Sequence, residues 1–403
     1  MNDEQAWLSR KFLTYKLFTN LWFLSAVWLY FYRLFITDQQ VGILDGMAFA
    51  IGLLAEIPSG ALADRFGRDK MVRLGHILAG TGLLIQAAGS DFLLFFVGQA
   101  VMMVGVSFVS GADEALFFER LKFKRESTAW RKLLMRGSQV ALLGTLSATI
   151  LGGWLHTINP RIPWMLTGAS FVVAALLVWP VKDRRPRKGR QKVLVEIKDY
   201  LVDIKTGFQQ FQLPRLRLYV PIILTVQGLF YTAEYGLLLL VLLSQFHFSP
   251  FWGSLVVASS GLITVGLLSY LHKHAEKMSE KHVLASISLA AAASLLLSIA
   301  DIGYWGYIVI LALYAGEHIL SPFMSEVLNY HAPEKQRATV LSIASFFKTL
   351  PYVALAPLIG SLSTHGQLDY FLLGWPILIC IAAGAYLLLQ RKDARITVQE
   401  ELS

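Results

Sequence analysis

The sequence has 403 residues, of which 55% are hydrophobic and 16% are charged, and its mean hydropathy is +0.53. A soluble globular domain carries about 25% charged residues. Apolar segments as long and frequent as these exclude a soluble enzyme and indicate a membrane protein. The net charge of +9 does not indicate nucleic-acid binding, because the basic residues lie in short loops between apolar segments.

Twelve segments are long and apolar enough to span a membrane, which takes about 20 residues each. In chain order they are 13–36, 41–62, 71–90, 92–117, 137–158, 162–181, 218–244, 250–271, 283–301, 304–328, 337–363 and 369–390. The first is too long for the core of a signal peptide and lacks a small-residue cleavage site, so we expect it to be retained. The sequence therefore predicts an all-α membrane protein with twelve transmembrane helices.

Lysine and arginine concentrate in every second loop, and such loops stay in the cytoplasm. The basic loops are 65–73, 120–136, 182–217, 272–282, 329–336 and the C-terminal tail. The opposite side has only Arg33 and Arg161. We therefore expect both termini in the cytoplasm. The sequence has no Asn-x-Ser/Thr acceptor, which favours a bacterial inner membrane.

One long connection separates six spans from six. It divides the chain into an N-terminal half, 1–181, a basic linker, 182–217, and a C-terminal half, 218–403. Apolar linker residues recur every three or four positions and predict an amphipathic helix on the inner membrane surface. They are Ile197, Leu201, Ile204, Phe208 and Phe211. A solvated linker with no fixed place is the alternative.

The loop between spans 2 and 3, residues 60–70, reads GALADRFGRDK. It resembles the G-x-L-A-D-R-x-G-R signature, motif A, of the major facilitator superfamily. Residues 333–342 are similar to that family's loop into span 11. The resemblance implies two six-helix halves that work by alternating access, with a cytoplasmic gate that holds one state. On this sequence the gate residues would be Gly60, Asp64, Arg65, Gly67 and Arg68.

Acidic residues near the inner end of span 4 lie at the depth of this loop. They are Asp113, Glu114 and Glu119. Because Arg65 and Arg68 lie at the same depth, we expect these three residues to belong to a conformational charge network rather than to the substrate site.

The sequence also departs from the family's drug/proton antiporters. Span 4 has Gln99 and Val101 near the position of their intramembrane arginine, and the Gly-Pro pattern of span 5 is reduced to residues 148–153. The second-half counterpart of motif A, near 270–281, is degenerate. Span 5 keeps Gly144, Ala148 and Gly152 on one narrow face, which would serve either as a rocking interface or for plain tight packing.

Ionisable side chains inside the spans are the candidate functional residues, because a charge at the bilayer centre costs about 2.5–3.5 kcal/mol. Span 7 presents Gln227, Tyr231 and Glu234 on one stripe. Span 10 carries Glu317 and His318, and span 11 carries Lys348. We expect these six residues to serve substrate and protons near the midplane. A permanent Glu317–Lys348 ion pair and a purely structural His318 are the alternatives.

Three further charged residues have possible roles near the membrane spans. Arg33 and Asp45, at the outer ends of spans 1 and 2, could form a structural ion pair. Glu56 could join either the gate or the intramembrane site. Neither role follows from the sequence alone.

These observations predict a secondary active transporter, because the sequence has no nucleotide-binding loop, no catalytic constellation and no spacing typical of metal ligands. We expect proton-coupled efflux of a small organic or drug-like solute by a monomer in the bilayer, without a cofactor, nucleic acid or enzymatic activity. The alternatives are a symporter or uniporter for a small nutrient, a non-transporting sensor of the same fold, and an integral-membrane enzyme.

Overall fold

A computed structural model describes residues 3–121, 128–183, 202, 205–274 and 279–401, which contain helices and no strands. Within these residues, nine helices are long and apolar enough to cross a membrane, and the bent pair Asp38–Glu56 and Pro58–Phe66 gives a tenth. Ile162–Val178 is apolar but shorter. Each of the twelve predicted segments contains helical residues, and the all-α membrane fold is confirmed.

The chain forms two compact units. The first comprises Met1–Ile36, Met47–Tyr200 and Pro250–Leu255, and the second comprises Thr37–Gly46, Leu201–Ser249 and Val256–Ser403. Two short segments therefore pack away from their neighbours in sequence: residues 37–46 belong to the second unit, and residues 250–255 belong to the first.

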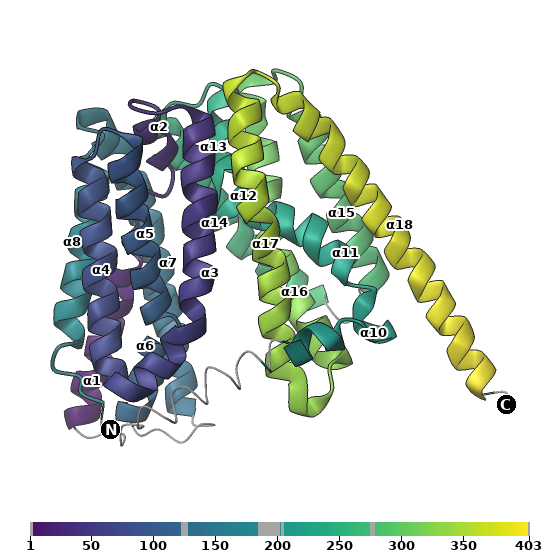
Figure 1. Ribbon diagram of the computed structural model, residues 1–403, viewed down its shortest axis with the longest axis horizontal. Helices are drawn as coiled ribbons and strands as arrows, with labels where there is room; N and C mark the ends of the chain where they lie inside the picture. The colour runs from purple at the N-terminus through teal and green to yellow at the C-terminus, as the bar shows by residue number, and fades with distance from the viewer. Residues whose placement is uncertain (1–2, 122–127, 184–201, 203–204, 275–278, 402–403) are drawn as a thin grey trace. The chain divides into compact units, whose positions relative to one another are not determined.

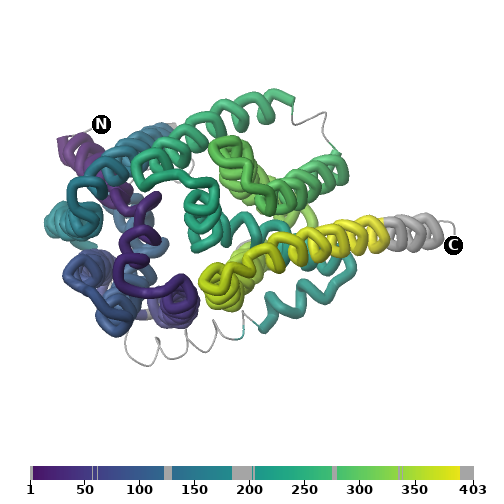
Figure 2. The backbone as a smooth tube through the Cα atoms, turned by 90° about the horizontal axis from the view of Figure 1, so that it is seen from above, coloured from purple at the N-terminus to yellow at the C-terminus, as the bar shows by residue number. Residues whose placement is uncertain are grey.

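Within the described residues, the first unit is built on eight helices, of which α3 begins in the second unit (Figure 1). They are α1 (Asp3–Thr19), α2 (Trp28–Tyr32), α3 (Asp38–Phe66), α4 (Arg68–Ala88), α5 (Phe92–Val109), α6 (Ala112–Leu121), α7 (Thr128–Ile158) and α8 (Ile162–Val178). Helix α4 packs against α5 and α8, and Figure 2 shows these helices nearly end-on. Gly82 and Gly98 make the α4–α5 approach possible, because a Cβ added at either would collide with the carbonyl of the other.

Three predicted spans of this unit are bent or interrupted. Helix α3 bends by 47° at Pro58, which lacks an N–H and clashes with the preceding turn. The prediction of one continuous helix over 13–36 is wrong, because α1 ends at Thr19. Side chains bind backbone carbonyls at this break: Asn20 Nδ2 donates to Lys16 O at 2.8 Å, and Ser25 Oγ donates to Trp22 O at 2.7 Å. Span 4 breaks before α6 at Gly111, where φ is +70°.

The small-residue face of span 5 packs within the first unit. A Cβ added at Gly152 would collide with the carbonyl of Phe23, and one added at Gly144 would lie 3.0 Å from Leu17 Cδ1. This face therefore packs tightly against the segment from α1 to α2.

The second unit contains the remaining described elements, except for the first residues of α14, which belong to the first unit. These elements are α10 (Pro214–Arg217), α11 (Val220–Ile222), a π-helix η1 (Ile223–Gln227), α12 (Gly228–Glu234), α13 (Leu237–Gln245), α14 (Pro250–His274), α15 (Glu280–Leu297), η3 (Gly303–Gly306), α16 (Tyr307–His331), η4 (Glu334–Gln336), α17 (Arg337–Thr364) and α18 (Leu368–Glu401). The predicted span 218–244 is thus four short helices in succession. It breaks at Gly236, where the Leu237 N–H donates to the Tyr352 hydroxyl at 3.1 Å.

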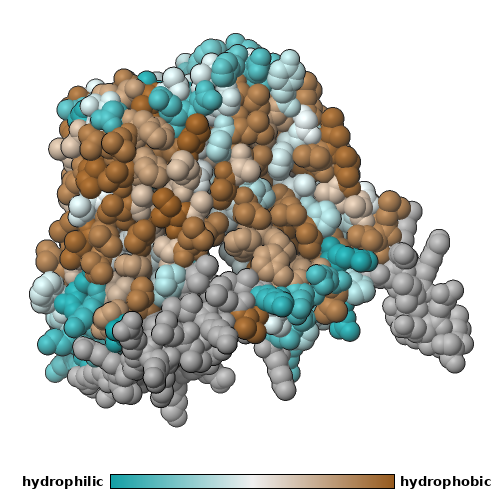
Figure 3. Space-filling model, viewed as in Figure 1, coloured by the Kyte–Doolittle hydropathy of each residue, from teal (hydrophilic) through white to brown (hydrophobic). Residues whose placement is uncertain are grey.

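The molecular surface agrees with a bilayer environment. Figure 3 shows hydrophobic side chains over the middle of each unit's visible face and hydrophilic ones towards its ends. Leu388, Ile381 and Leu289 are exposed to 67%, 62% and 72%, as expected of lipid-facing positions.

Only part of the predicted linker helix lies within the described residues. The Phe208 and Phe211 rings each lie 5.2 Å from the Phe347 ring of α17. Phe211 is therefore buried against protein rather than inserted in lipid. Ile197, Leu201 and Ile204 lie outside the described residues.

Candidate functional site

The structure brings five of the six predicted intramembrane residues together inside the second unit. Tyr231 and Glu234 come from α12, Glu317 and His318 from α16, and Lys348 from α17. The contacts described below join them into one cluster. The sixth residue, Gln227, ends the π-helix and is buried.

Glu317 and Lys348 form an ion pair. The Lys348 Nζ to Glu317 Oε1 distance is 2.8 Å, and the two side chains are only 15% and 5% exposed. Nζ also lies 3.4 Å from Ser321 Oγ and 5.3 Å from the centre of the Tyr231 ring. Glu317 Oε2 is buried and has no hydrogen-bond partner among the described residues. Half of this carboxylate's accepting capacity is thus unused.

The contact between Glu234 and His318 depends on the presence of one additional proton. His318 Nε2 lies 3.5 Å from Glu234 Oε1, and His318 Nδ1 lies 3.1 Å from the Tyr314 carbonyl. A carbonyl only accepts, so Nδ1 must carry the hydrogen. In a neutral ring Nε2 would then present a lone pair to an ionised carboxylate. An attractive contact therefore needs one more proton, on Glu234 or on His318.

The charges of this cluster do not balance without that proton. Two carboxylates, Glu234 and Glu317, lie around one ammonium, Lys348. Glu234 Oε2 is also buried without a partner among the described residues. A buried, uncompensated negative charge is strongly unfavourable, so the arrangement favours binding of a proton or a cationic group.

The predicted gate loop forms a tight turn between α3 and α4 in the first unit. Gly67 has φ of +99°, and an added Cβ there would lie 2.9 Å from Asp69 Oδ1, so the position requires glycine. The Arg68 N–H donates to Asp183 at 3.0 Å, and Arg68 Nη1 lies 2.7 Å from Glu119 Oε1. This turn is therefore tied to α6.

The remaining gate residues lie in the last turns of α3, before Gly67. The Arg65 guanidinium lies 4.9 Å from the centre of the Phe66 ring. Gly60 is exposed, with no atom near a Cβ added there, and Asp64 is half-buried.

Of the three acidic residues expected in the charge network, Glu119 contacts a gate arginine and Glu114 contacts a lysine. Glu114 Oε1 lies 2.7 Å from Lys16 Nζ of α1, and Glu119 is the partner of Arg68. The reason is the break at Gly111, after which α6 begins and directs its first turn towards α1. Sequence reasoning overlooked Lys16, although a lysine within a predicted span was the available signal.

Asp45 also has a partner that the sequence did not suggest. Its carboxylate accepts a hydrogen bond from the Tyr352 hydroxyl of α17, within the second unit. Tyr352 is fully buried, and its hydroxyl also accepts a hydrogen bond from the Leu237 N–H. It therefore joins the first turns of α3 to the break in span 7.

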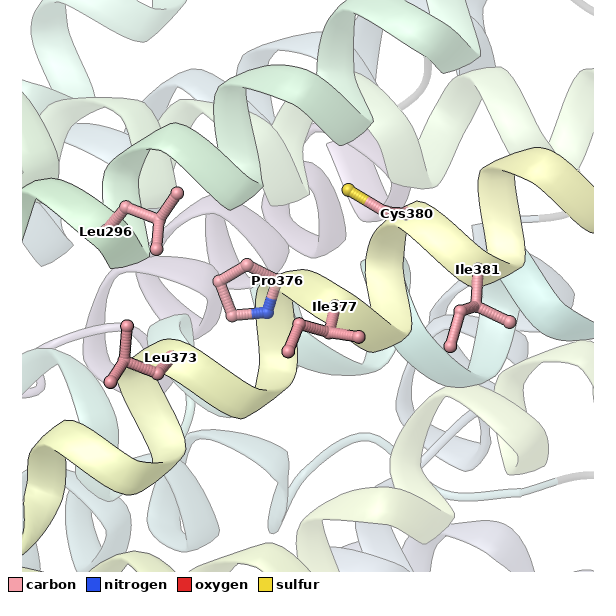
Figure 4. A pocket seen from close by; sticks show the side chains of 6 residues that line it. All are labelled: Leu296, Leu373, Pro376, Ile377, Cys380 and Ile381. Atoms are coloured by element: carbon pink, nitrogen blue, oxygen red, sulfur yellow. The ribbon is translucent and has the colours of Figure 1, made fainter.

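A cavity between α15 and α18 does not belong to the candidate site. Figure 4 shows its lining of Leu296, Leu373, Pro376, Ile377, Cys380 and Ile381. None of these side chains carries a charge. Within the described ranges, no group of three His, Cys, Asp or Glu side chains is placed to hold a metal ion.

Comparison with known proteins supports the transporter architecture. The chain is 22% identical over 388 residues to the quinolone resistance protein NorA of Staphylococcus aureus, covering 91% of both chains. It is 26% identical over 162 residues to multidrug resistance protein 2 of Bacillus subtilis, covering 39% of this chain and 40% of that one.

Solved structures share the fold at low sequence identity. The crystal structure of a bacterial homologue of the human lysosomal transporter Spinster, inward-facing and unoccupied, matches with a TM-score of 0.68 at 15% identity, covering 97% of this chain and 98% of that one. The POT family transporter PepTSo matches with a TM-score of 0.73 at 12% identity, covering 96% and 98%.

The family assignment rests on the sequence itself. The pattern of the Major Facilitator Superfamily matches residues 12–356, which is more than half of the chain. The chain therefore belongs to the Major Facilitator Superfamily and is a multi-pass membrane transporter rather than an enzyme.

Proposed function

We propose that this protein exports a small organic solute in exchange for protons. The observation that carries the proposal is the Glu234–His318 contact, which needs one proton beyond those that the hydrogen bonds of His318 account for. The names of its relatives, resistance to quinolones and to multiple drugs, support export of drug-like compounds. The protein would act as a monomer in a bacterial inner membrane, with both termini in the cytoplasm.

In this mechanism Glu234 and His318 hold the transported proton and the Glu317–Lys348 pair sets the local charge. When the proton is bound, on Glu234 or on His318, the positive and negative charges of the cluster balance. When it leaves, the cluster carries one net negative charge, which attracts a cationic or hydrogen-bond-donating solute to the unused oxygens of Glu234 and Glu317. Proton and solute would then occupy the site in turn, which is the requirement for exchange.

The gate turn would control which side of the membrane the site faces. The Arg68–Glu119 ion pair and the glycine turn at Gly67 hold the cytoplasmic ends of α4 and α6 together in this state. Transport would require this contact to be made and broken once per cycle.

A uniporter or symporter for a small nutrient is the second candidate. It is favoured by Gln99, which stands near the place of the span 4 arginine of the drug/proton antiporters, and by the missing span 5 proline. In that case Glu234 and His318 would bind the solute directly.

Proteoliposomes enclosing a pH-sensitive dye test the proposal. The parent, Glu234→Gln and Glu317→Gln would be given an imposed gradient of a fluoroquinolone, of ethidium as a lipophilic cation, or of a nucleoside. We expect fluoroquinolone or ethidium movement to drive protons the opposite way in the parent, and this proton movement to be lost in Glu234→Gln. Asp301→Asn is the matched control, since Asp301 is an exposed carboxylate of the same unit.

The sign of the pH change separates the candidates. Protons moving with the solute would indicate symport, and solute movement with no pH change would indicate uniport. Full proton coupling in Glu234→Gln would contradict the assignment of the proton to this site.

A further inference from the structure

A second cluster of titratable side chains lies inside the first unit, away from the candidate site. The Tyr15 hydroxyl of α1 lies 2.8 Å from Nε2 of His76 on α4 and 3.1 Å from Oδ2 of Asp113 on α6. Tyr15 and His76 are 0% and 1% exposed, whereas the Asp113 side chain is 15% exposed. The three groups form one hydrogen-bonded chain with Asp113 at its more accessible end.

This chain fits two protonation states that differ by one proton. Tyr15 has a single hydroxyl hydrogen to donate. If Asp113 is ionised, Tyr15 donates to it and His76 donates to Tyr15 from Nε2. If Asp113 is protonated, it donates to Tyr15, Tyr15 donates to Nε2 of His76, and the ring hydrogen of His76 lies on Nδ1. Between the two states the Nε2 hydrogen passes to Tyr15, the Tyr15 hydrogen passes to Asp113, and the added proton binds Nδ1 of His76, while every heavy atom keeps its place.

Nothing in the surroundings fixes the tautomer of His76. Its Nδ1 is buried and has no hydrogen-bond partner among the described residues. The ring packs 5.6 Å from the Phe171 ring of α8, which offers no hydrogen-bonding group. His318 differs, because the Tyr314 carbonyl fixes the hydrogen on its Nδ1.

The charges around Asp113 favour uptake of a proton. Lys16 Nζ lies 2.7 Å from Glu114 Oε1 and 3.7 Å from Asp113 Oδ2, so two carboxylates share one ammonium. These are the charged groups that the described residues of α1 and α6 direct at the chain, and α4 contributes His76. A proton on Asp113 leaves one carboxylate for one ammonium.

We propose that Tyr15, His76 and Asp113 form a second proton-binding site, in which uptake of one proton protonates Asp113 and moves the hydrogen of His76 from Nε2 to Nδ1. The site goes beyond the proposed function, because none of its residues belongs to the second unit. It would give the transporter one proton site in each unit.

Nitrogen NMR of the histidine rings tests the site without any substrate. The full chain, labelled with ¹⁵N-histidine, would be studied in lipid nanodiscs between about pH 3.5 and pH 9, a range that includes the ordinary pKa values of histidine, about 6.5, and of aspartate, about 3.9. The protein has nine histidines, and His76→Gln identifies the signal of His76 by difference. We expect the Nε2–H tautomer at high pH and the Nδ1–H tautomer at low pH.

Asp113→Asn should abolish this change of tautomer. Asp69→Asn is the matched control, because Asp69 is a buried carboxylate of the same unit that pairs with Arg73 at 2.9 Å, outside the chain. It should preserve the change. Tyr15→Phe keeps the ring but breaks the chain, so it should also abolish the change and replaces Asp113→Asn if that variant does not fold.

Two results would overturn the proposal. One is a single tautomer of His76 over the whole pH range in the parent. The other is a change of tautomer that survives in both Asp113→Asn and Tyr15→Phe. Failure of the proposed function is distinguishable, because Glu234→Gln should leave the His76 signal unchanged while it removes solute-driven proton movement.

Discussion

The two units hold polar clusters of the same composition in different arrangements. Each has two carboxylates, one lysine and one histidine: Glu234, Glu317, Lys348 and His318 in the second unit, and Asp113, Glu114, Lys16 and His76 in the first. In the second unit the lysine binds the deeply buried Glu317, which is 5% exposed. In the first it binds Glu114, which is 53% exposed.

The histidines differ in the same sense. His318 faces its carboxylate directly, whereas Tyr15 lies between His76 and Asp113. The comparison shows that the placement of these four groups decides whether the lysine neutralises a buried carboxylate or pairs with an exposed one that solvent partly screens. The following changes measure that difference.

The largest effect is expected from Lys348→Met. Removing one partner of a buried ion pair leaves an uncompensated charge, which costs about 3–5 kcal/mol of the free energy of unfolding. Equilibrium unfolding in mixed micelles measures it. The double variant Lys348→Met, Glu317→Gln should recover most of the loss, and equal losses in the single and double variants would show that the packing of the lysine, not its charge, matters.

A smaller effect is expected from Tyr15→Phe. The change removes a hydroxyl that joins two buried groups, so His76 Nε2 and Asp113 lose a shared partner, at a cost of about 1–3 kcal/mol. Tyr30→Phe, in the same unit, is a control for loss of a half-buried tyrosine hydroxyl. The same unfolding measurement applies, and no difference between the two variants would contradict a structural role for the chain.

The smallest effect is expected from Lys16→Met. Lys16 lies closer to the exposed Glu114, at 2.7 Å, than to Asp113, at 3.7 Å, so its loss should cost about 0–1 kcal/mol. The loss should shrink further at high salt, which screens exposed charges. A loss as large as that of Lys348→Met would erase the distinction between the two clusters.

Much of the fold could be predicted from sequence because hydropathy is a local property. The positions of the spans follow from runs of apolar residues, and each predicted segment contains helix. Their interruptions could not be predicted. The breaks after Thr19 and at Gly236 depend on hydrogen bonds of the Asn20 and Tyr352 side chains with particular backbone atoms. A mean hydropathy over about 20 residues does not report the contribution of one such residue.

The candidate site divides in the same way. Glu317 and Lys348 could be identified because each is an isolated charge in an apolar span, and they do pair. The Lys16–Glu114 pair joins residues 98 positions apart, and only the break at Gly111 brings them together. Neither residue spacing nor composition reports such a contact.

The exchange of short segments between the units also bears on biosynthesis. Residues 250–255 belong to the first unit, so their contacts with it can form only after the ribosome has passed the start of α14. Residues 37–46, made much earlier, must wait for α17 to be synthesised before the Asp45–Tyr352 bond can form. We therefore expect a chain cut within the linker to assemble only when both pieces are made together.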